Sequence, residues 1–335
     1  MEHLEKYVED AILNASGANR VARVELIQHL WSGYGKILRV RIEGGDYQTV
    51  IAKHICLEGS NVHPRGWNSD RSHDRKVKSY EVETAWYLDW AHRCDDSCRI
   101  PRLLAREARG EGALIVLEDL DAAGYPERMV AVEWPQLTAC LSWLANFHAT
   151  FVGTKPEDLW EVGTYWHLDT RRDELEAMED SELRGAARAI DEKLRAAKYQ
   201  TLVHGDAKLA NFCFSAAGDR VAAVDFQYVG GGCGMKDLAY FVGSCLDEAE
   251  CEAMEDRVLD HYFTVLDSAL ERHGKGQHAA ALIAEWRELF PVAWTDFHRF
   301  IKGWSPGHWK INSYSERVAK EVVAALGRRD PEGRS

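Results

Sequence analysis

The sequence predicts an α+β protein of two lobes: a small N-terminal antiparallel sheet with one long helix, then a larger, mainly helical C-terminal lobe. Short strand patterns separated by glycine turns occupy residues 24–53. A long helical pattern runs from Asp74 to about Cys94, and two short strand patterns lie at 212–214 and 221–224. With 335 residues, 46% of them hydrophobic, the chain is long enough to bury a core in each lobe.

The N-terminal sheet begins with strand patterns at residues 24–30 and 37–42, joined by a glycine-containing turn at 31–36. Glycines let backbone N–H groups approach a phosphate closely, although a plain β-turn explains the same pattern. The candidate nucleotide-binding residues in this turn are Ser32, Gly33, Tyr34 and Gly35. A second glycine turn at 44–46 leads into the strand pattern 49–53, which ends in Lys53.

The helical pattern after this strand carries two glutamates, Glu81 and Glu83, on partly apolar stripes. Either carboxylate can pair with Lys53, and the periodicity does not choose between them. Two more strand patterns follow at 102–105 and 113–118, around a turn at 109–112. We therefore expect an N-terminal lobe of residues 1–118 and a C-terminal lobe of residues 119–335.

The strongest chemical signal lies at residues 204–225. Asp206 belongs to a His-Gly-Asp loop, Asn211 follows five residues later, and Asp225 ends the second strand of a short hairpin. Folding of this hairpin about Gly218 brings Asn211 opposite Asp225. Two such oxygen ligands suit Mg²⁺, which completes its shell with phosphates and water. Asp206 can accept a proton from a substrate hydroxyl, as the loop aspartate of a phosphoryl-transfer enzyme does.

These motifs resemble those of the aminoglycoside phosphotransferase and choline kinase superfamily, and of its ecdysteroid-kinase-like members in particular. The resemblance covers residues 24–245 and is carried by segments 117–120, 144–149, 204–211 and 225–227. It implies a protein-kinase-like fold and transfer of the γ-phosphoryl group of ATP, with Mg²⁺, to a hydroxyl of a small molecule.

The resemblance assigns roles to the residues that match its motifs. It implies that Asp206 is the catalytic base and that Asn211 and Asp225 bind the metal. It also implies that Lys53, paired with a helix glutamate, orients the nucleotide. Related kinases often place this glutamate three residues before an aromatic-Tyr pair, here residues 86–87, which favours Glu83.

Further residues take supporting roles by the same resemblance. Adenine is expected to bind main-chain groups between Glu118 and Leu120, and His204 and Asp237 are expected to support the catalytic loop. Lys208 departs from the choline-kinase pattern, in which His or Trp is frequent at this position. It is either a contact to the γ-phosphate, as in protein kinases, or a surface lysine.

The segment between Asp225 and Asp237 distinguishes two kinds of kinase. It contains only residues 226–236, including glycines at 230, 231, 232 and 234. A protein kinase needs room here for an activation loop that ends in Ala-Pro-Glu, a motif that this segment lacks. The sequence therefore favours a small-molecule acceptor. A protein kinase and a non-catalytic nucleotide-binding regulator are the alternatives.

Acceptor recognition is expected in the C-terminal lobe, where aromatic residues gather at 163–169 and 294–309. Asp296, Trp304 and Trp309 are the candidates, because aromatic faces beside a carboxylate suit a cationic ligand. Packing roles for the tryptophans and an internal salt bridge for Asp296 explain the same residues. The formal net charge of −13 is compatible with a cationic acceptor and argues against nucleic acid as a partner.

Other features limit the setting of the protein. Eight cysteines without a disulfide framework predict a reducing, cytoplasmic environment. The charged residues among 1–16 do not form a signal peptide, and no apolar run is long enough to predict a membrane span. Residues 58–72 are either a lid over the nucleotide or an insertion, and a monomer and a homodimer are both compatible with the sequence.

Overall fold

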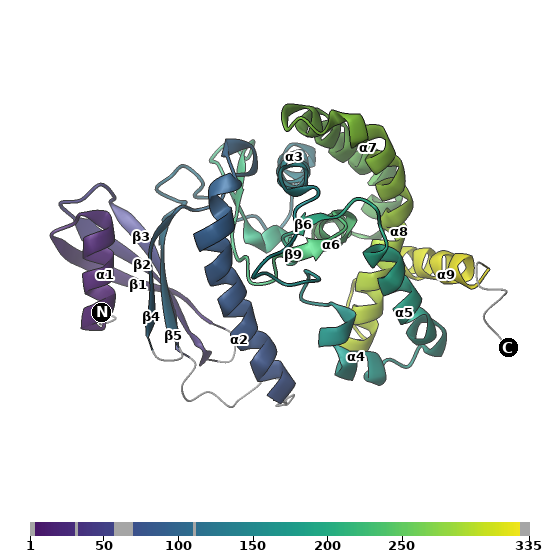
Figure 1. Cartoon of the computed structure of the whole chain (residues 1–335), viewed down its shortest axis with the longest axis horizontal. Helices are drawn as coiled ribbons and strands as arrows, with labels where there is room; N and C mark the ends of the chain where they lie inside the picture. Colours follow the sequence, from purple (N-terminus) through teal and green to yellow (C-terminus); the bar gives the residue numbers. More distant parts are fainter. Residues whose placement is uncertain (1–3, 31–32, 57–69, 110–111, 329–335) are drawn as a thin grey trace.

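The computed structural model describes residues 4–30, 33–56, 70–109 and 112–328 (Figure 1). The predicted α+β fold class is confirmed: a five-stranded antiparallel sheet forms the N-terminal part, and helices dominate the C-terminal part. The order of the strands in the sheet is β1-β2-β3-β5-β4. Their bounds are Arg20–His29 for β1, Gly35–Glu43 for β2, Thr49–Ile55 for β3, Leu103–Arg109 for β4 and Gly112–Glu118 for β5.

Helices cover both faces of this sheet. Helix α1 (Lys6–Ser16) packs Val8 and Ile12 against one face, where Leu38, Val40 and Val116 are buried. Helix α2 (Asp70–Ala85) lies on the opposite side (Figure 1). The two faces follow from the alternation of side chains along a strand. Helix α1 was not predicted from the sequence, although residues 1–16 were recognised as amphipathic.

The long helix predicted from Asp74 to about Cys94 differs from the observed one at both ends. The α-helical part begins at Asp70 and ends at Ala85. A π-helical turn, Trp86–Trp90, and a 3₁₀ turn, Ala91–Arg93, continue it. In the π-helical turn the N–H of Ala91 donates to the carbonyl of Trp86, five residues back. This wider turn accommodates Trp86 and Tyr87, which are both buried.

The C-terminal part is built around α3 (Trp134–Phe151), which is buried over most of its length. The other helices are α4 (Arg172–Ala177), α5 (Ser181–Arg195), α6 (Met235–Cys245), α7 (Glu248–Arg272), α8 (Ala279–Trp304) and α9 (Ser313–Gly327). Two short ladders lie between them, β6 (Thr201–Val203) with β9 (Gly230–Gly232), and β7 (Phe212–Phe214) with β8 (Val221–Ala223). The β7–β8 pair is the predicted hairpin, and its turn contains Gly218 with a φ of 72°.

Apolar and polar contacts join the two parts across the end of β5. The Trp86 ring stacks on Phe226 with the ring centroids 4.7 Å apart, and it also contacts Phe147 and Phe151 of α3. The carbonyl of Arg99 accepts hydrogen bonds from the Trp143 indole N–H and from the backbone N–H of Ala223. One continuous apolar core therefore extends from the sheet into the helices.

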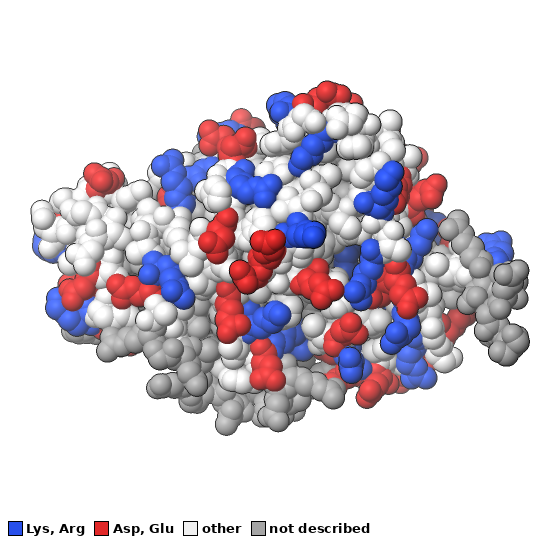
Figure 2. Space-filling view, in the orientation of Figure 1, with Lys and Arg blue, Asp and Glu red and all other residues white. Residues whose placement is uncertain are grey.

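The surface shows no single-sign field on the side drawn in Figure 2, where acidic and basic side chains are interspersed. The net charge of −13 is therefore not concentrated in one patch on this face. In the described part of the chain, no helix combines the length and the apolar character that crossing a membrane requires.

Trp86→Ala should destabilise the protein by about 3–5 kcal/mol, because truncation leaves a cavity where the Trp86 ring packs against α3 and Phe226. Urea denaturation measures the effect. Leu88→Ala is the matched control, since Leu88 lies in the same π-helical turn and is 48% exposed. Its cost should stay within about 0.5 kcal/mol. Equal effects of the two substitutions would show that the contacts of Trp86 with Phe147, Phe151 and Phe226 do not hold the N-terminal and C-terminal parts together.

Candidate functional site

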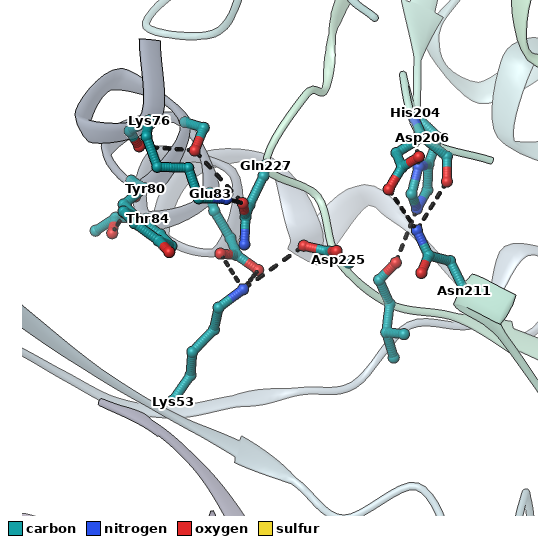
Figure 3. A network of polar contacts seen from close by, with 12 residues as sticks. Lys53, Lys76, Tyr80, Glu83, Thr84, His204, Asp206, Asn211, Asp225 and Gln227 are labelled. Atoms are coloured by element: carbon teal, nitrogen blue, oxygen red, sulfur yellow. Dashed lines mark hydrogen bonds and ion pairs between the residues drawn. The ribbon is translucent and has the colours of Figure 1, made fainter. Parts of the chain in front are cut away.

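The site lies where β3, α2 and the β7–β8 hairpin meet (Figure 3). Lys53, near the end of β3, projects its amine toward α2 and donates to both carboxylate oxygens of Glu83, at 2.6 and 2.8 Å. Both side chains are buried, whereas Glu81 is exposed. Of the two glutamates that the periodicity left open, Glu83 is the one that contacts Lys53. Burial acts to lower the pKa of the Lys53 amine. The carboxylates of Glu83 and Asp225 outweigh this effect, so the pKa lies above its usual range.

Asp225 lies between the Lys53–Glu83 pair and the loop that carries Asp206 (Figure 3). Its Oδ1 is 3.6 Å from the Lys53 amine and is buried without a hydrogen bond to any described residue. Its backbone has a φ of 69°, a left-handed conformation that Asp tolerates better than most residues. Burial acts to raise the pKa of Asp225, but nearby lysines, Lys53 and Lys76 foremost, hold it below its usual value. Asp225 is therefore an ionised carboxylate whose Oδ1 meets the Lys53 amine but accepts no hydrogen bond from a described residue.

Asp206 is held by three side chains. Lys208 donates to Oδ2 at 2.8 Å, Asn211 donates to the same oxygen at 3.0 Å, and Tyr240 of α6 donates to Oδ1 at 3.2 Å. Burial raises the pKa of Asp206, and the charge of Asp225 adds to this effect, while Lys208 opposes it. A carboxylate with a raised pKa is a better proton acceptor than an ordinary surface Asp.

Asp237, which lies in the first turn of α6, holds the Asp206 loop in place. Asp237 accepts hydrogen bonds from the backbone N–H groups of His204, at 2.5 Å, and Gly205, at 2.9 Å. It also contacts His148 of α3 at 3.2 Å. Gly205 has a φ of 79°, and a Cβ there would lie 2.1 Å from the Tyr228 carbonyl, so only glycine fits.

Two residues of the site escaped the sequence analysis. Lys76 donates to the Gln227 side chain at 2.6 Å and lies close enough to lower the pKa of Asp225. It precedes Glu83 by seven residues, which is two helical turns on the same face of α2, and this spacing could have identified it. Tyr240 follows Asp237 by three residues on α6 and faces the same loop.

The residues present fit a Mg²⁺ ion that is held chiefly by phosphates. Asp225 offers Oδ1, which accepts no hydrogen bond from a described residue, and Asn211 offers its amide oxygen because its nitrogen donates to Asp206. In the described ranges, no cluster of three or more His, Cys, Asp or Glu side chains has the arrangement of a metal site. Two oxygen ligands from protein are typical of Mg²⁺ that is shared with a nucleotide.

The segment after β5 carries the residues expected to bind adenine. The backbone N–H of Glu118 donates to the Arg102 carbonyl, and the Leu120 carbonyl accepts from Tyr125. The backbone N–H of Leu120 donates to no backbone carbonyl of the described chain. The Glu118 side chain pairs with Arg99, so it is not available to a ligand.

The glycine turn before β2 is packed tightly against the sheet. Gly35 has a φ of 131°, and a Cβ there would lie 2.0 Å from the His54 carbonyl. The Tyr34 hydroxyl contacts His73 of α2 at 2.7 Å, so its side chain is buried under the turn. Gly33 is exposed with a φ of 75°. Ser32 lies outside the described residues, as does most of the segment 58–72.

The three candidates for acceptor recognition have different environments. Asp296 is fully buried, accepts from the Trp166 indole at 3.0 Å and pairs with Arg299 at 2.7 Å. Its charge is therefore compensated inside the helical part. Trp304 stacks on Phe300 with the ring centroids 5.8 Å apart. Trp309 is 57% exposed.

Comparison with known proteins supports the predicted resemblance. A model of the ecdysteroid kinase-like family matches residues 161–275. No curated protein sequence matches the chain. A microcompartment-associated aminopropanol kinase is similar in structure, with a TM-score of 0.51, 16% identity, and coverage of 94% of this chain and 96% of the other.

Two other solved structures are similar at lower scores. An ethanolamine kinase from Plasmodium vivax has a TM-score of 0.47 and 11% identity, and the match covers 90% of this chain and 84% of the other. An aminoglycoside-3'-phosphotransferase of type VIII has a TM-score of 0.42 and 16% identity, with 85% and 100% covered. The family match agrees with the predicted ecdysteroid-kinase-like resemblance, and the similarity to the aminopropanol kinase structure shows a common fold.

Asp237→Asn should lower the free energy of unfolding by about 3 kcal/mol. One amide oxygen cannot replace two carboxylate oxygens, so a buried backbone N–H of the loop loses its acceptor. Thermal and urea denaturation measure the loss. Asp219→Asn, in the exposed turn of the β7–β8 hairpin, is the control and should behave as wild type. A wild-type stability for Asp237→Asn would mean that Asp237 does not fix the Asp206 loop.

Proposed function

We propose that the protein is a kinase that transfers the γ-phosphoryl group of Mg-ATP to a hydroxyl of a small molecule. The observation that carries this proposal is the position of Asp225. Its Oδ1, which accepts no hydrogen bond from a described residue, lies between the buried Lys53–Glu83 pair and the Asp206 loop (Figure 3). A nucleotide phosphate bound at this point has a cation on one side and a proton acceptor on the other.

The nucleotide would be held by groups from both parts of the molecule. The Leu120 N–H is available to an acceptor nitrogen of adenine. Lys53 supplies a positive charge to the phosphates, and Glu83 fixes the position of that charge. Asn211 and Asp225 would hold Mg²⁺, which would neutralise phosphate charge when bound.

Asp206 would act on the acceptor. Its Oδ2 takes the hydroxyl proton while the hydroxyl oxygen forms a bond to the γ-phosphorus, and the bond from that phosphorus to the leaving oxygen of ADP breaks. Lys208, 2.8 Å from Oδ2, places a second positive charge beside the group in transfer. The catalytic contribution of these residues is positioning and charge neutralisation, as in other phosphoryl transfers.

The chain after Asp225 supports a small acceptor over a polypeptide. Its glycine-rich part forms β9, which pairs with β6. A Cβ at Gly230 would lie 2.2 Å from the Trp160 carbonyl, so the backbone packs against its neighbour too closely for any residue other than glycine. A docking segment for a peptide, which needs an extended loop here, has no room between Asp225 and Asp237.

Asp206→Asn should lower turnover by about 10²–10⁴-fold, because the amide cannot accept the hydroxyl proton, while Mg-ATP binding persists. Asp225→Asn should weaken Mg-ATP binding as well, and Asn is suited to the positive φ at this position. Transfer of label from [γ-³²P]ATP to a panel of hydroxylated metabolites, with calorimetry for binding, measures both effects.

Asp219→Asn on the same hairpin is the control for these two variants and should leave transfer unchanged. Full turnover by purified Asp206→Asn would contradict the proposal. Transfer to polypeptides but not to small alcohols would favour a protein kinase. Nucleotide binding without transfer to any acceptor would favour a regulator.

Lys53→Met should raise the KM for ATP at least tenfold, because the variant removes the buried cation and leaves Glu83 without its partner. Glu83→Gln should have a smaller effect in the same direction, since the Lys53 charge stays but loses its fixed position. Steady-state kinetics at saturating acceptor measure both. Lys78→Met, which replaces an exposed lysine of α2, is the control. Unchanged KM values would remove Lys53 from the nucleotide site.

A further inference from the structure

Lys310 lies close to the proposed base, on the chain between α8 and α9. Its amine lies over the rings of Tyr240, at 5.1 Å from the centroid, and Phe297, at 5.2 Å. It also lies 5.6 Å from the Trp309 ring centroid. Tyr240 is the residue whose hydroxyl donates to Asp206. Tyr240 therefore contacts the Lys310 amine through its ring and, through its hydroxyl, the carboxylate that would receive the acceptor proton.

No carboxylate of the described chain forms an ion pair with Lys310. Burial is the main influence on this amine and lowers its pKa to about 8. Asp206 and Cys245 act in the opposite direction, while Lys208 lowers the pKa further. The other lysine at this end of the site, Lys208, is already paired with Asp206. Lys310 is thus a partly buried cation whose closest partners are aromatic ring faces.

The neighbouring aromatic residues form a cluster beside it, which we call the aromatic wall and in which Tyr240, Phe297 and Phe300 are buried while Tyr165 and Trp304 are partly exposed. Its members are Tyr165, Tyr240, Phe297, Phe300 and Trp304. The Tyr165 ring packs against the rings of Tyr240 and Phe300, at centroid distances of 5.5 and 5.4 Å. Arg171 lies over this wall as well, but it pairs with Glu174 at 3.0 Å. Arg171 therefore has a carboxylate partner, whereas Lys310 has none among the described residues.

A cationic acceptor does not suit this arrangement. The ring faces of Tyr240 and Phe297 already receive a positive charge from the chain itself, and a second ammonium beside it would be repelled. Asp296, the carboxylate that would have neutralised such a ligand, is engaged with Arg299 and Trp166. An anionic group would instead gain an ion pair with Lys310, which no carboxylate in the described part of the chain provides.

We infer that Lys310 binds an anionic group of the acceptor, which is an alcohol with an apolar body and a carboxylate or similar anion. This inference rests on the proposed kinase function of the same site. The hydroxyl would face Asp206, the apolar body would pack beside Tyr165 and Trp304, the partly exposed members of the aromatic wall, and the anion would meet Lys310. Lys310 is then a specificity-determining residue.

Three probes of equal length test the inference: hydroxyhexanoate, aminohexanol and hexanediol. Calorimetry in the presence of Mg²⁺ and a non-hydrolysable ATP analogue measures their affinity for the full-length protein. We expect hydroxyhexanoate to bind at least tenfold more tightly than either other probe. Lys310→Met should abolish this preference, and Lys310→Arg should keep it. Lys320→Met, at an exposed position of α9, should behave as wild type.

A second measurement needs no variant. Reductive methylation with ¹³C labels the lysine amines, and binding of an anion should raise the pKa of the Lys310 amine in an NMR titration. Hydroxyhexanoate should cause this change, and hexanediol should not. Equal or tighter binding of aminohexanol, absence of hydroxyhexanoate binding, or an unchanged Lys310 resonance would each overturn the inference.

These outcomes are distinct from failure of the proposed function. If the nucleotide does not bind or no phosphoryl group is transferred, the kinase proposal fails whatever the probes do. If the nucleotide binds and transfer occurs to aminohexanol but not to hydroxyhexanoate, the kinase proposal stands and the role of Lys310 is refuted.

Discussion

The buried amine of Lys53 is the point at which three separate stretches of the chain meet. It comes from β3 of the sheet, its first partner Glu83 comes from α2, and its second, Asp225, follows the β7–β8 hairpin. A buried charge without a partner is costly, by about 3–5 kcal/mol when one member of such a pair is removed. The sheet, the helix and the hairpin must therefore be positioned together. Asp225 Oδ1, which accepts no hydrogen bond from a described residue, is left at the centre of this arrangement.

The apolar core next to these charges restricts how they can move. Phe226 directly follows Asp225 and stacks on Trp86, with the planes inclined by 12°. Its neighbour on the other side is the His204 ring, 4.5 Å away. The same aromatic core thus contacts the chain next to Asp225 and at the start of the Asp206 loop. We regard this as the reason that short loops can carry Asp206 and Asp225.

Much of this organisation was predictable from the sequence, because it depends on local patterns. Strand alternation, glycine turns and the spacing of Asp206, Asn211 and Asp225 predicted the sheet, the hairpin and the grouping of these side chains. The π-helical turn was missed because it depends on how Trp86 and Tyr87 pack against residues far away in sequence. Lys310 was missed for the same reason: its proximity to Tyr240 arises only when the chain after α8 returns to α6.

The proposed kinase function depends most on a cation that is bound to the nucleotide and lies between Asp225 and Asn211. A crystal structure with a non-hydrolysable ATP analogue and Mn²⁺ in place of Mg²⁺ tests this most directly, because Mn²⁺ is located by its anomalous scattering. The account predicts one Mn²⁺ in direct contact with Asp225 Oδ1 and the Asn211 amide oxygen, with the terminal phosphate facing Asp206. A nucleotide bound elsewhere, or a Mn²⁺ that contacts neither residue, would contradict it.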